Sequence, residues 1–289
     1  MAMGGRRSGL ARHAGAAAAV APAGLYVVAL LVLPFLFLVW ISLQDGDPLM
    51  VEHTQWTLQH YGKVLTDSLY LDALMGTLRL GVIVTLVTLV LGYPVALFIA
   101  QSGSRFTTLA MAIVVLPLFV SVVVRSFGWM VLLGRQGLVN RLLMALGITD
   151  APMQLLYTPG AVTMGLAHIL APLMILPIAS VLRGMDPALP EAARNLGASR
   201  LKVFLTVTLP LSLPGVAAGC VLVLAHVIAA FVLPALIGSD RVRLTATMIY
   251  QQVMVANNVP LGAALAVVMV VATFLLLASA RLLSRRWHD

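Results

Sequence analysis

The chain has 289 residues, of which 61% are apolar and only 10% are charged, and its formal net charge is +8. Soluble domains carry roughly 25% charged residues, so this composition excludes a soluble globular domain and indicates several membrane spans. The chain has no aromatic-basic nucleic-acid motif, so an anionic membrane surface explains the basic excess better than nucleic acid does. The single cysteine, Cys220, excludes an internal disulfide.

The first 20 residues form a basic and then alanine-rich segment, which we expect to be an N-terminal tail. The apolar segment 21–43 is long enough to cross a bilayer, and no later cleavage site is evident, so we interpret it as an uncleaved first transmembrane helix. The polar residues 44–68 then predict a periplasmic loop.

Residues 69–283 predict one transmembrane domain with five further helices, since a spanning backbone must satisfy its hydrogen bonds internally. The alternation of period two that marks membrane barrels is absent. The fold class is therefore all-α, a polytopic protein with six transmembrane helices. The five further spans are expected at 69–100, 106–133, 158–182, 203–237 and 259–283, with a short outer helix near 139–145, an inner loop at 183–202 and a tail at 284–289.

The basic residues divide unequally between the two sides of this arrangement. Predicted inner segments carry eleven Lys and Arg residues and predicted outer loops carry five. Inner loops of membrane proteins are enriched in Lys and Arg, so both termini and the loop 183–202 are expected in the cytoplasm.

The inner loop 183–202 contains local signals for a short helix and a sharp turn. Asp186 can cap free N–H groups, and Ala192 and Ala193 are strong helix formers. Gly197 suits the left-handed position that ends a helix, and Ser199 can cap the next one. A short helix with a small, flat face suits docking into a groove on another protein.

The same loop resembles the "EAA" signature of membrane permeases of binding-protein-dependent ABC importers. The signature is Glu-Ala-Ala, three residues, Gly, nine residues, Ile, one residue, and then Leu-Pro. Val207 stands where the family prefers Ile, which is a minor departure. The matching positions here are Glu191, Ala192, Ala193, Gly197, Val207, Leu209 and Pro210, and stretches 91–94, 124–129, 155–159 and 261–264 are similar to the spermidine/putrescine-type branch.

The resemblance implies the type-I ABC importer permease fold, a location in the bacterial inner membrane, and alternating access driven by partner ATPases. It implies four kinds of partner: a second, related permease chain, two ATPase subunits, a periplasmic substrate-binding protein and the lipid bilayer. ATP and Mg²⁺ would be bound by the ATPases, so no cofactor is expected in this chain. The residues expected to couple to the ATPase are Glu191, Ala192, Ala193, Gly197, Ala198 and Ser199.

Polar and aromatic residues in or near the spans are candidates for the gate or the pathway. Arg125 lies 20 residues from Arg105, about 30 Å along a straight helix, which would place it near the outer interface. There it could anchor the helix or act at an outer gate. His168 and His226 could pack between helices or line the pore. The full candidate set is Arg125, Phe127, Trp129, His168, His226 and Phe231.

Other classes of protein fit less well. A self-sufficient secondary transporter would need intramembrane acids, and no Asp or Glu lies deep in a predicted span. An intramembrane enzyme lacks motif support, since no phosphate-binding loop, serine elbow or metal-ligand spacing is present. The branch resemblance suggests a polyamine-like solute. An amino-acid-like solute, an opine or an organic anion remains the alternative.

Overall fold

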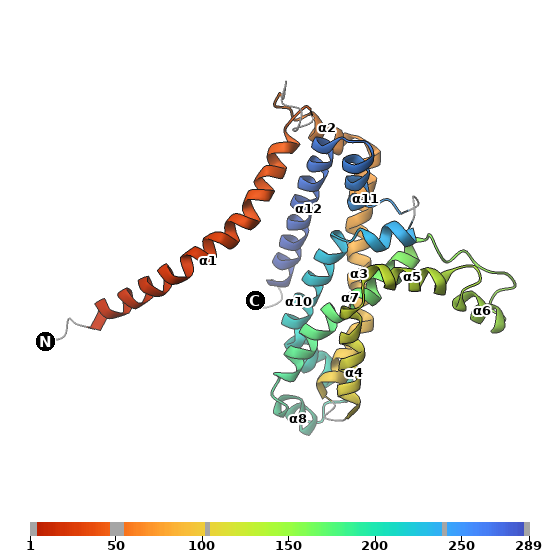
Figure 1. Ribbon diagram of the computed structural model, residues 1–289. Helices are drawn as coiled ribbons and strands as arrows, with labels where there is room; N and C mark the ends of the chain where they lie inside the picture. Colours follow the sequence, from red (N-terminus) through yellow and green to blue (C-terminus); the bar gives the residue numbers. More distant parts are fainter. Residues whose placement is uncertain (1–4, 47–54, 102–104, 239–241, 286–289) are drawn as a thin grey trace.

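The computed structural model describes residues 5–46, 55–101, 105–238 and 242–285, and the regular elements in these ranges are all helical (Figure 1). This confirms the all-α fold class. Six helical stretches among the described residues are long and apolar enough to cross a membrane, as expected. They are Gly24–Ser42, Ser68–Gln101, Val122–Ala145, Pro159–Arg183, Arg200–Ile228 and Val259–Ala278.

Three of the predicted spans are single, unbroken helices with nearly the expected bounds. They are α3 (Ser68–Gln101), α7 (Pro159–Arg183) and α12 (Val259–Arg285). The first helix, α1 (Gly5–Ser42), begins well before the predicted span. The segment expected to be a tail is therefore part of α1, because its alanine run favours helix. The side chains of Arg6, Arg7 and Arg12, and residues 286–289, lie outside what the structure describes.

The third predicted span, 106–133, is wrong as a single helix. It divides into α4 (Arg105–Val115), a 3-10 turn (Leu116–Phe119) and α5 (Val122–Leu133). Pro117 lies in the turn, and the Ser121 hydroxyl accepts a hydrogen bond from the amide of Val123 and so begins a new helix. In Figure 1, α5 leaves the direction of α4 and leads to α6 (Leu138–Ala145), which is the predicted outer helix.

The fifth predicted span, 203–237, is also shorter than expected. After α9 (Arg200–Val203) and a π-helical turn, η2 (Phe204–Thr208), the helix α10 runs over Leu209–Ile228. A second π-helical turn, η3, covers Pro234–Gly238 after an irregular stretch. Pro210 lies in the first turn of α10, where a missing amide hydrogen is tolerated better, whereas Pro214 lies inside the helix.

The segment between the predicted fifth and sixth spans contains ordered helix. It holds α11 (Thr245–Tyr250) and a third π-helical turn, η5 (Gln251–Val255). In Figure 1, α11 and α2 (Gln59–Thr66) lie at one end of the molecule and α8 (Ala188–Asn195) lies at the other. The loops 44–68 and 183–202 are therefore at opposite ends of the bundle, as the sequence predicted.

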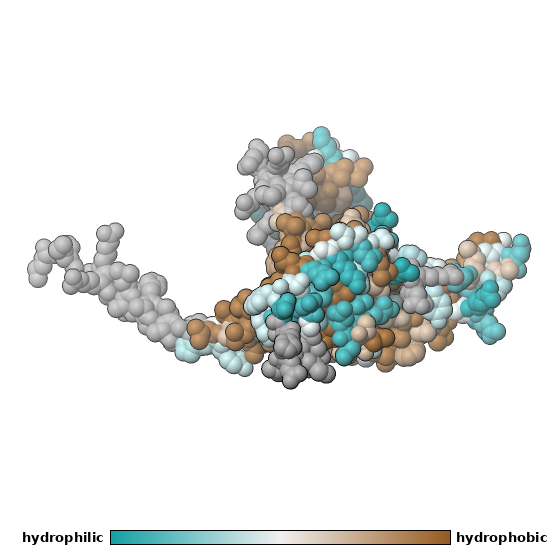
Figure 2. All heavy atoms as spheres, turned by 90° about the horizontal axis from the view of Figure 1, so that it is seen from above, coloured by the Kyte–Doolittle hydropathy of each residue, from teal (hydrophilic) through white to brown (hydrophobic). Residues whose placement is uncertain are grey.

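The core is built where α3, α7 and α10 pack together, with α7 in contact with both of the other two. Its centre holds Val84, Met174, Ile178 and Val223, each with no exposed surface. Seen from above, hydrophilic residues gather over the middle of the molecule and apolar residues lie around them (Figure 2). Apolar flanks of this kind suit contact with lipid or with other membrane subunits.

The helix α1 is attached to this bundle at its C-terminal end. The hydroxyls of Ser42 and Tyr61 are 2.6 Å apart, and the His60 ring nitrogen lies 3.0 Å from the carbonyl oxygen of Gln44. α1 packs along α12, but the rest of the helix diverges from the bundle (Figure 1). Its apolar side chains are mostly exposed.

Candidate functional site

The loop 183–202 folds into the short helix and turn that its sequence indicates. A carboxylate oxygen of Asp186 accepts a hydrogen bond of 2.9 Å from the Ala188 amide, which begins α8. The helix has no buried residue, so it stands on the surface of the chain. Leu196, directly after it, is 89% exposed. An apolar side chain presented to this extent at the end of the bundle suits contact with a partner.

The turn after α8 is set by Gly197, whose φ is +84°. Its amide donates to the Arg194 carbonyl (2.9 Å), and the Ala198 amide donates to the Ala193 carbonyl (3.1 Å). The Ser199 hydroxyl then accepts from the Lys202 amide at 3.4 Å, which begins α9. The structure therefore places the six coupling candidates in one compact unit, with Glu191 and Ala192 exposed.

This unit leads directly into the bundle through η2. The ring of Phe204 in η2 lies edge-on to the ring of Tyr93 in α3, with a centroid distance of 5.7 Å. The Tyr93 hydroxyl lies 2.8 Å from the hydroxyl of Ser212 in α10, and Ser212 donates to the Leu209 carbonyl. Sequence reasoning missed Tyr93 as a site residue, although it stands in the family-like stretch 91–94.

Three of the gate candidates come together where α5 crosses α7. The rings of Trp129 and His168 meet edge-to-face at 5.7 Å, and Arg125 lies within electrostatic range of His168. Among the described residues, Nε and Nη1 of Arg125 are buried without a hydrogen-bond acceptor. The calculated depth of 30 Å for Arg125 was wrong, because the chain between Arg105 and Arg125 is not one straight helix.

The other gate candidates are separate from this group. Phe127 is exposed on α5, and His226 is exposed on α10 with its ring nitrogen 2.9 Å from the carbonyl oxygen of Leu222 in the same helix. Phe231 instead meets Tyr250, with ring centroids 4.9 Å apart. Tyr250 was not a candidate, since no local sequence pattern links it to Phe231. The described residues include no group of three or more His, Cys, Asp or Glu side chains that could hold a metal ion.

Comparisons with known proteins place this architecture among transport proteins. Residues 89–289 match the family described as binding-protein-dependent transport system inner membrane component. The chain is 33% identical over 265 residues to the spermidine/putrescine transport system permease protein PotB of Escherichia coli K12, covering 90% of this chain and 96% of that protein. It is 32% identical over 268 residues to the PotB of Salmonella typhimurium SL1344, covering 91% and 93%.

Solved structures agree with the fold. The chain resembles a subunit of a bacterial alginate ABC transporter, crystallised with a periplasmic protein bound to an alginate pentasaccharide, with a TM-score of 0.78 and 21% identity. The match covers 96% of each chain. These findings confirm the resemblance that the signature in loop 183–202 indicated.

Proposed function

Because the chain belongs to the family of binding-protein-dependent transport system inner membrane components, we propose that it carries a polyamine-like solute across the membrane. The chain is a permease subunit of an ATP-driven ABC importer, a multi-pass inner-membrane protein, and not an enzyme. One observation carries the choice of solute: the identity of 33% to a spermidine/putrescine permease protein extends over 265 residues.

The chain forms half of the translocation pathway and pairs with a second, related permease chain. Two ATPase subunits bind ATP and Mg²⁺, and a periplasmic binding protein delivers the solute. The shared fold with a transporter crystallised with its periplasmic protein supports this assembly. In the cycle, ATP binding closes the ATPases and moves α8, so that the bundle opens outward. Hydrolysis and phosphate release then restore the inward state.

The contact with the ATPase is made by α8 and the turn at Gly197. The exposed Glu191 and Ala192, together with Leu196, form the surface that enters a groove on the ATPase. Glu191 lies in the first turn of α8, where a carboxylate stabilises the helix by about 0.3–1 kcal/mol. Motion of α8 then reaches α10 through η2 and the contact between Phe204 and Tyr93.

The chain has both termini and α8 in the cytoplasm and the loops 44–68 and 240–258 in the periplasm. The excess of basic residues on the α8 side supports this orientation. In a variant in which Cys220 is replaced, we expect Leu58→Cys to react with an impermeant thiol reagent on intact cells. Ala198→Cys should react only after permeabilisation. If Ala198→Cys is labelled on intact cells, both the proposed orientation and the proposed role of α8 are wrong.

Two glycines provide a matched test of the ATPase contact. Gly197 and Gly147 both have positive φ, +84° and +67°, and a Cβ atom added to either meets no atom within 4 Å. Alanine at either position therefore opposes the left-handed turn at a cost of about 1–2 kcal/mol, without a steric clash of the added Cβ atom. Only Gly197 adjoins α8. Gly197→Ala should weaken capture of the ATPase by the solubilised permease, and Gly147→Ala should retain it. Equal capture by both variants removes α8 from the contact.

The solute is tested on the cognate binding protein and then on uptake. We expect spermidine or putrescine to bind in a ligand screen, and uptake to require the co-expressed ATPase. Uptake without any ATPase would instead identify a secondary transporter. If the binding protein instead selects an amino acid or an opine, the transported solute is not a polyamine.

A second candidate solute, an organic anion, is favoured by one observation. Arg125 presents two buried nitrogen atoms without an acceptor among the described residues, beside His168 and Trp129. A carboxylate passing this point would supply that acceptor. Arg125→Gln should then reduce uptake of an anion with ATPase capture unchanged. If Arg125 only anchors α5, uptake in Arg125→Gln equals that of the parent.

A further inference from the structure

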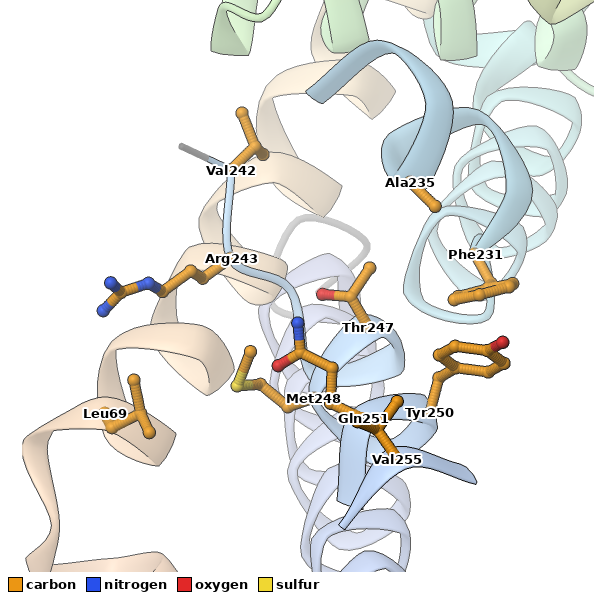
Figure 3. A pocket seen from close by; sticks show the side chains of 10 residues that line it. All are labelled: Leu69, Phe231, Ala235, Val242, Arg243, Thr247, Met248, Tyr250, Gln251 and Val255. Atoms are coloured by element: carbon orange, nitrogen blue, oxygen red, sulfur yellow. The ribbon is translucent and has the colours of Figure 1, made fainter. Parts of the chain in front are cut away.

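A cavity of about 650 Å³ lies at the end of the bundle opposite α8, between the start of α3, the segment 231–238, the residues directly before α11 and the α11–η5 unit (Figure 3). Sites for small ligands occupy roughly 300–1,000 Å³, so the cavity can hold a small solute. It is lined by Leu69, Phe231, Ala235, Val242, Arg243, Thr247, Met248, Tyr250, Gln251 and Val255.

Two aromatic rings from separate elements form one side of this cavity. Phe231 follows α10 and Tyr250 ends α11, and their ring centroids are 4.9 Å apart with the planes inclined by 34°. Figure 3 shows the two side chains facing one another. Tyr250 is 47% exposed, so part of its ring is accessible from the cavity. The face of an aromatic ring attracts cations within about 6 Å of its centre.

The polar groups beside the rings have different roles. The Thr247 hydroxyl donates to the Leu244 carbonyl at 2.7 Å and accepts from the Leu244 amide, so it is used in beginning α11. Gln251 is exposed, and its amide lies between Met248 and Thr247 in Figure 3. A glutamine carbonyl oxygen accepts hydrogen bonds from an ammonium group. Figure 3 shows this amide on the side of the cavity away from the two rings, so Gln251 offers a polar contact at a distance from them.

The positive charge that lines the cavity lies on one side of it. Arg243 points away from Phe231 and Tyr250 (Figure 3), and no carboxylate lines the cavity among the described residues. An ammonium group is therefore repelled from the Arg243 side and directed to the rings. Without a carboxylate its binding is weak, which suits a transit site, since a transport pathway must release what it binds.

The backbone around the cavity also departs from regular helix. The π-helical turns η3 and η5 supply Ala235, Gln251 and Val255 to its lining. Such turns occur frequently at functional sites. The first residue of α11 is held on α3, because the Thr77 hydroxyl accepts a hydrogen bond from the Thr245 amide at 2.8 Å. The cavity thus has one fixed side and one side built of irregular turns.

We propose that this cavity is a solute-binding site of the permease itself, in which an alkylammonium group rests against the accessible side of the paired rings of Phe231 and Tyr250. The inference deepens the proposed function and rests on it for the identity of the amine. The site takes organic cations after their release from the binding protein.

The test uses the assembled permease and ATPase complex without the binding protein. Saturation-transfer NMR detects weak binding, and putrescine and its uncharged diacetyl derivative serve as probes. Parent complex and Tyr250→Phe should transfer magnetisation to putrescine but not to the diacetyl derivative. Tyr250→Leu and Phe231→Leu should bind putrescine roughly tenfold more weakly. Phe274→Leu, which removes an exposed ring of α12 that does not line the cavity, should bind like the parent.

Equal transfer in Tyr250→Leu and the parent overturns the site, as does absence of transfer in the parent. Unchanged stimulation of the ATPase by the loaded binding protein shows that each variant is assembled. The ligand screen on the binding protein separates the two proposals. If that protein binds polyamines and the permease gives no signal, only the cavity site fails. If it rejects polyamines and the permease still binds putrescine through Tyr250, only the proposed solute fails.

Discussion

The helices α1 and α7 are both long, apolar and able to span a membrane, yet they differ sharply in burial. In the most apolar part of each, 61% of α7 is buried inside the chain against 6% of α1. Hydrophobicity does not explain the difference, because lipid tails are as apolar as a protein core. Apolar composition identifies a membrane-spanning helix, whereas small residues determine which of these helices pack closely together.

The contact between α7 and α10 shows how small residues act. A Cβ atom added to Gly215 would lie 2.8 Å from the Pro177 carbonyl oxygen and 3.0 Å from the Ile178 Cα. One added to Gly219 would lie 3.2 Å from the Met174 Cα. The two backbones therefore approach to a distance that only glycine permits. A Cβ atom added to Gly24 of α1 meets no atom within 4 Å.

The largest loss of stability is expected from a substitution that leaves a cavity where α7 packs in the core. Leu166 is 3% exposed and belongs to the main core, so Leu166→Ala should destabilise the chain by about 2–5 kcal/mol. A thermal melt of the purified permease in detergent measures this. A transition within a degree of the parent shows that α7 can collapse around the lost volume.

Overpacking of the same contact should have the next largest effect. Gly215→Ala places a methyl group against backbone atoms that move only if the helices separate, at a cost of about 1–3 kcal/mol. Gly24→Ala on α1 is the matched control and should melt like the parent or slightly higher. Equal melting of the two variants contradicts the close approach of α7 and α10.

Much of this fold follows from the sequence because its signals are local. Continuous apolar length predicts α3, α7 and α12. Capping by Asp186, a left-handed Gly197 and capping by Ser199 are each decided by neighbouring residues, and the structure has all three. The coupling unit was therefore predictable in shape, although its contact with an ATPase remains a proposal.

The remaining features depend on contacts between distant residues. Pro94, Pro172 and Pro177 lie inside unbroken helices, whereas the chain around Pro117 is divided. The presence of proline alone therefore does not predict whether a helix continues or is interrupted. The pairs formed by Phe231 with Tyr250 and by Trp129 with His168 join separate parts of the chain, and no sequence spacing predicts such pairs.

A smaller effect is expected at the inner end of the bundle. Tyr93→Phe removes the hydrogen bond to Ser212 but retains the ring against Phe204. Ser212 still donates to the Leu209 carbonyl, so no donor is left unpaired, and the loss should be about 0.5–1.5 kcal/mol. Tyr26→Phe on α1, where the side chain is 68% exposed, is the control. The melt of Tyr93→Phe should fall between those of Tyr26→Phe and Gly215→Ala.

The smallest effect is expected at Leu31, which is 67% exposed on α1. In Leu31→Ala the lost methyl groups leave no cavity inside the chain, because lipid or detergent fills the space, and the transfer between apolar surroundings is nearly neutral. The melt of the single chain should equal that of the parent. The same atoms are removed in Leu166→Ala, where the expected loss of stability is about 2–5 kcal/mol. The two substitutions are chemically identical, so the surroundings of the side chain account for the difference in stability. A shift for Leu31→Ala as large as that for Leu166→Ala would mean that α1 packs into the bundle, and the difference between α1 and α7 would then be lost.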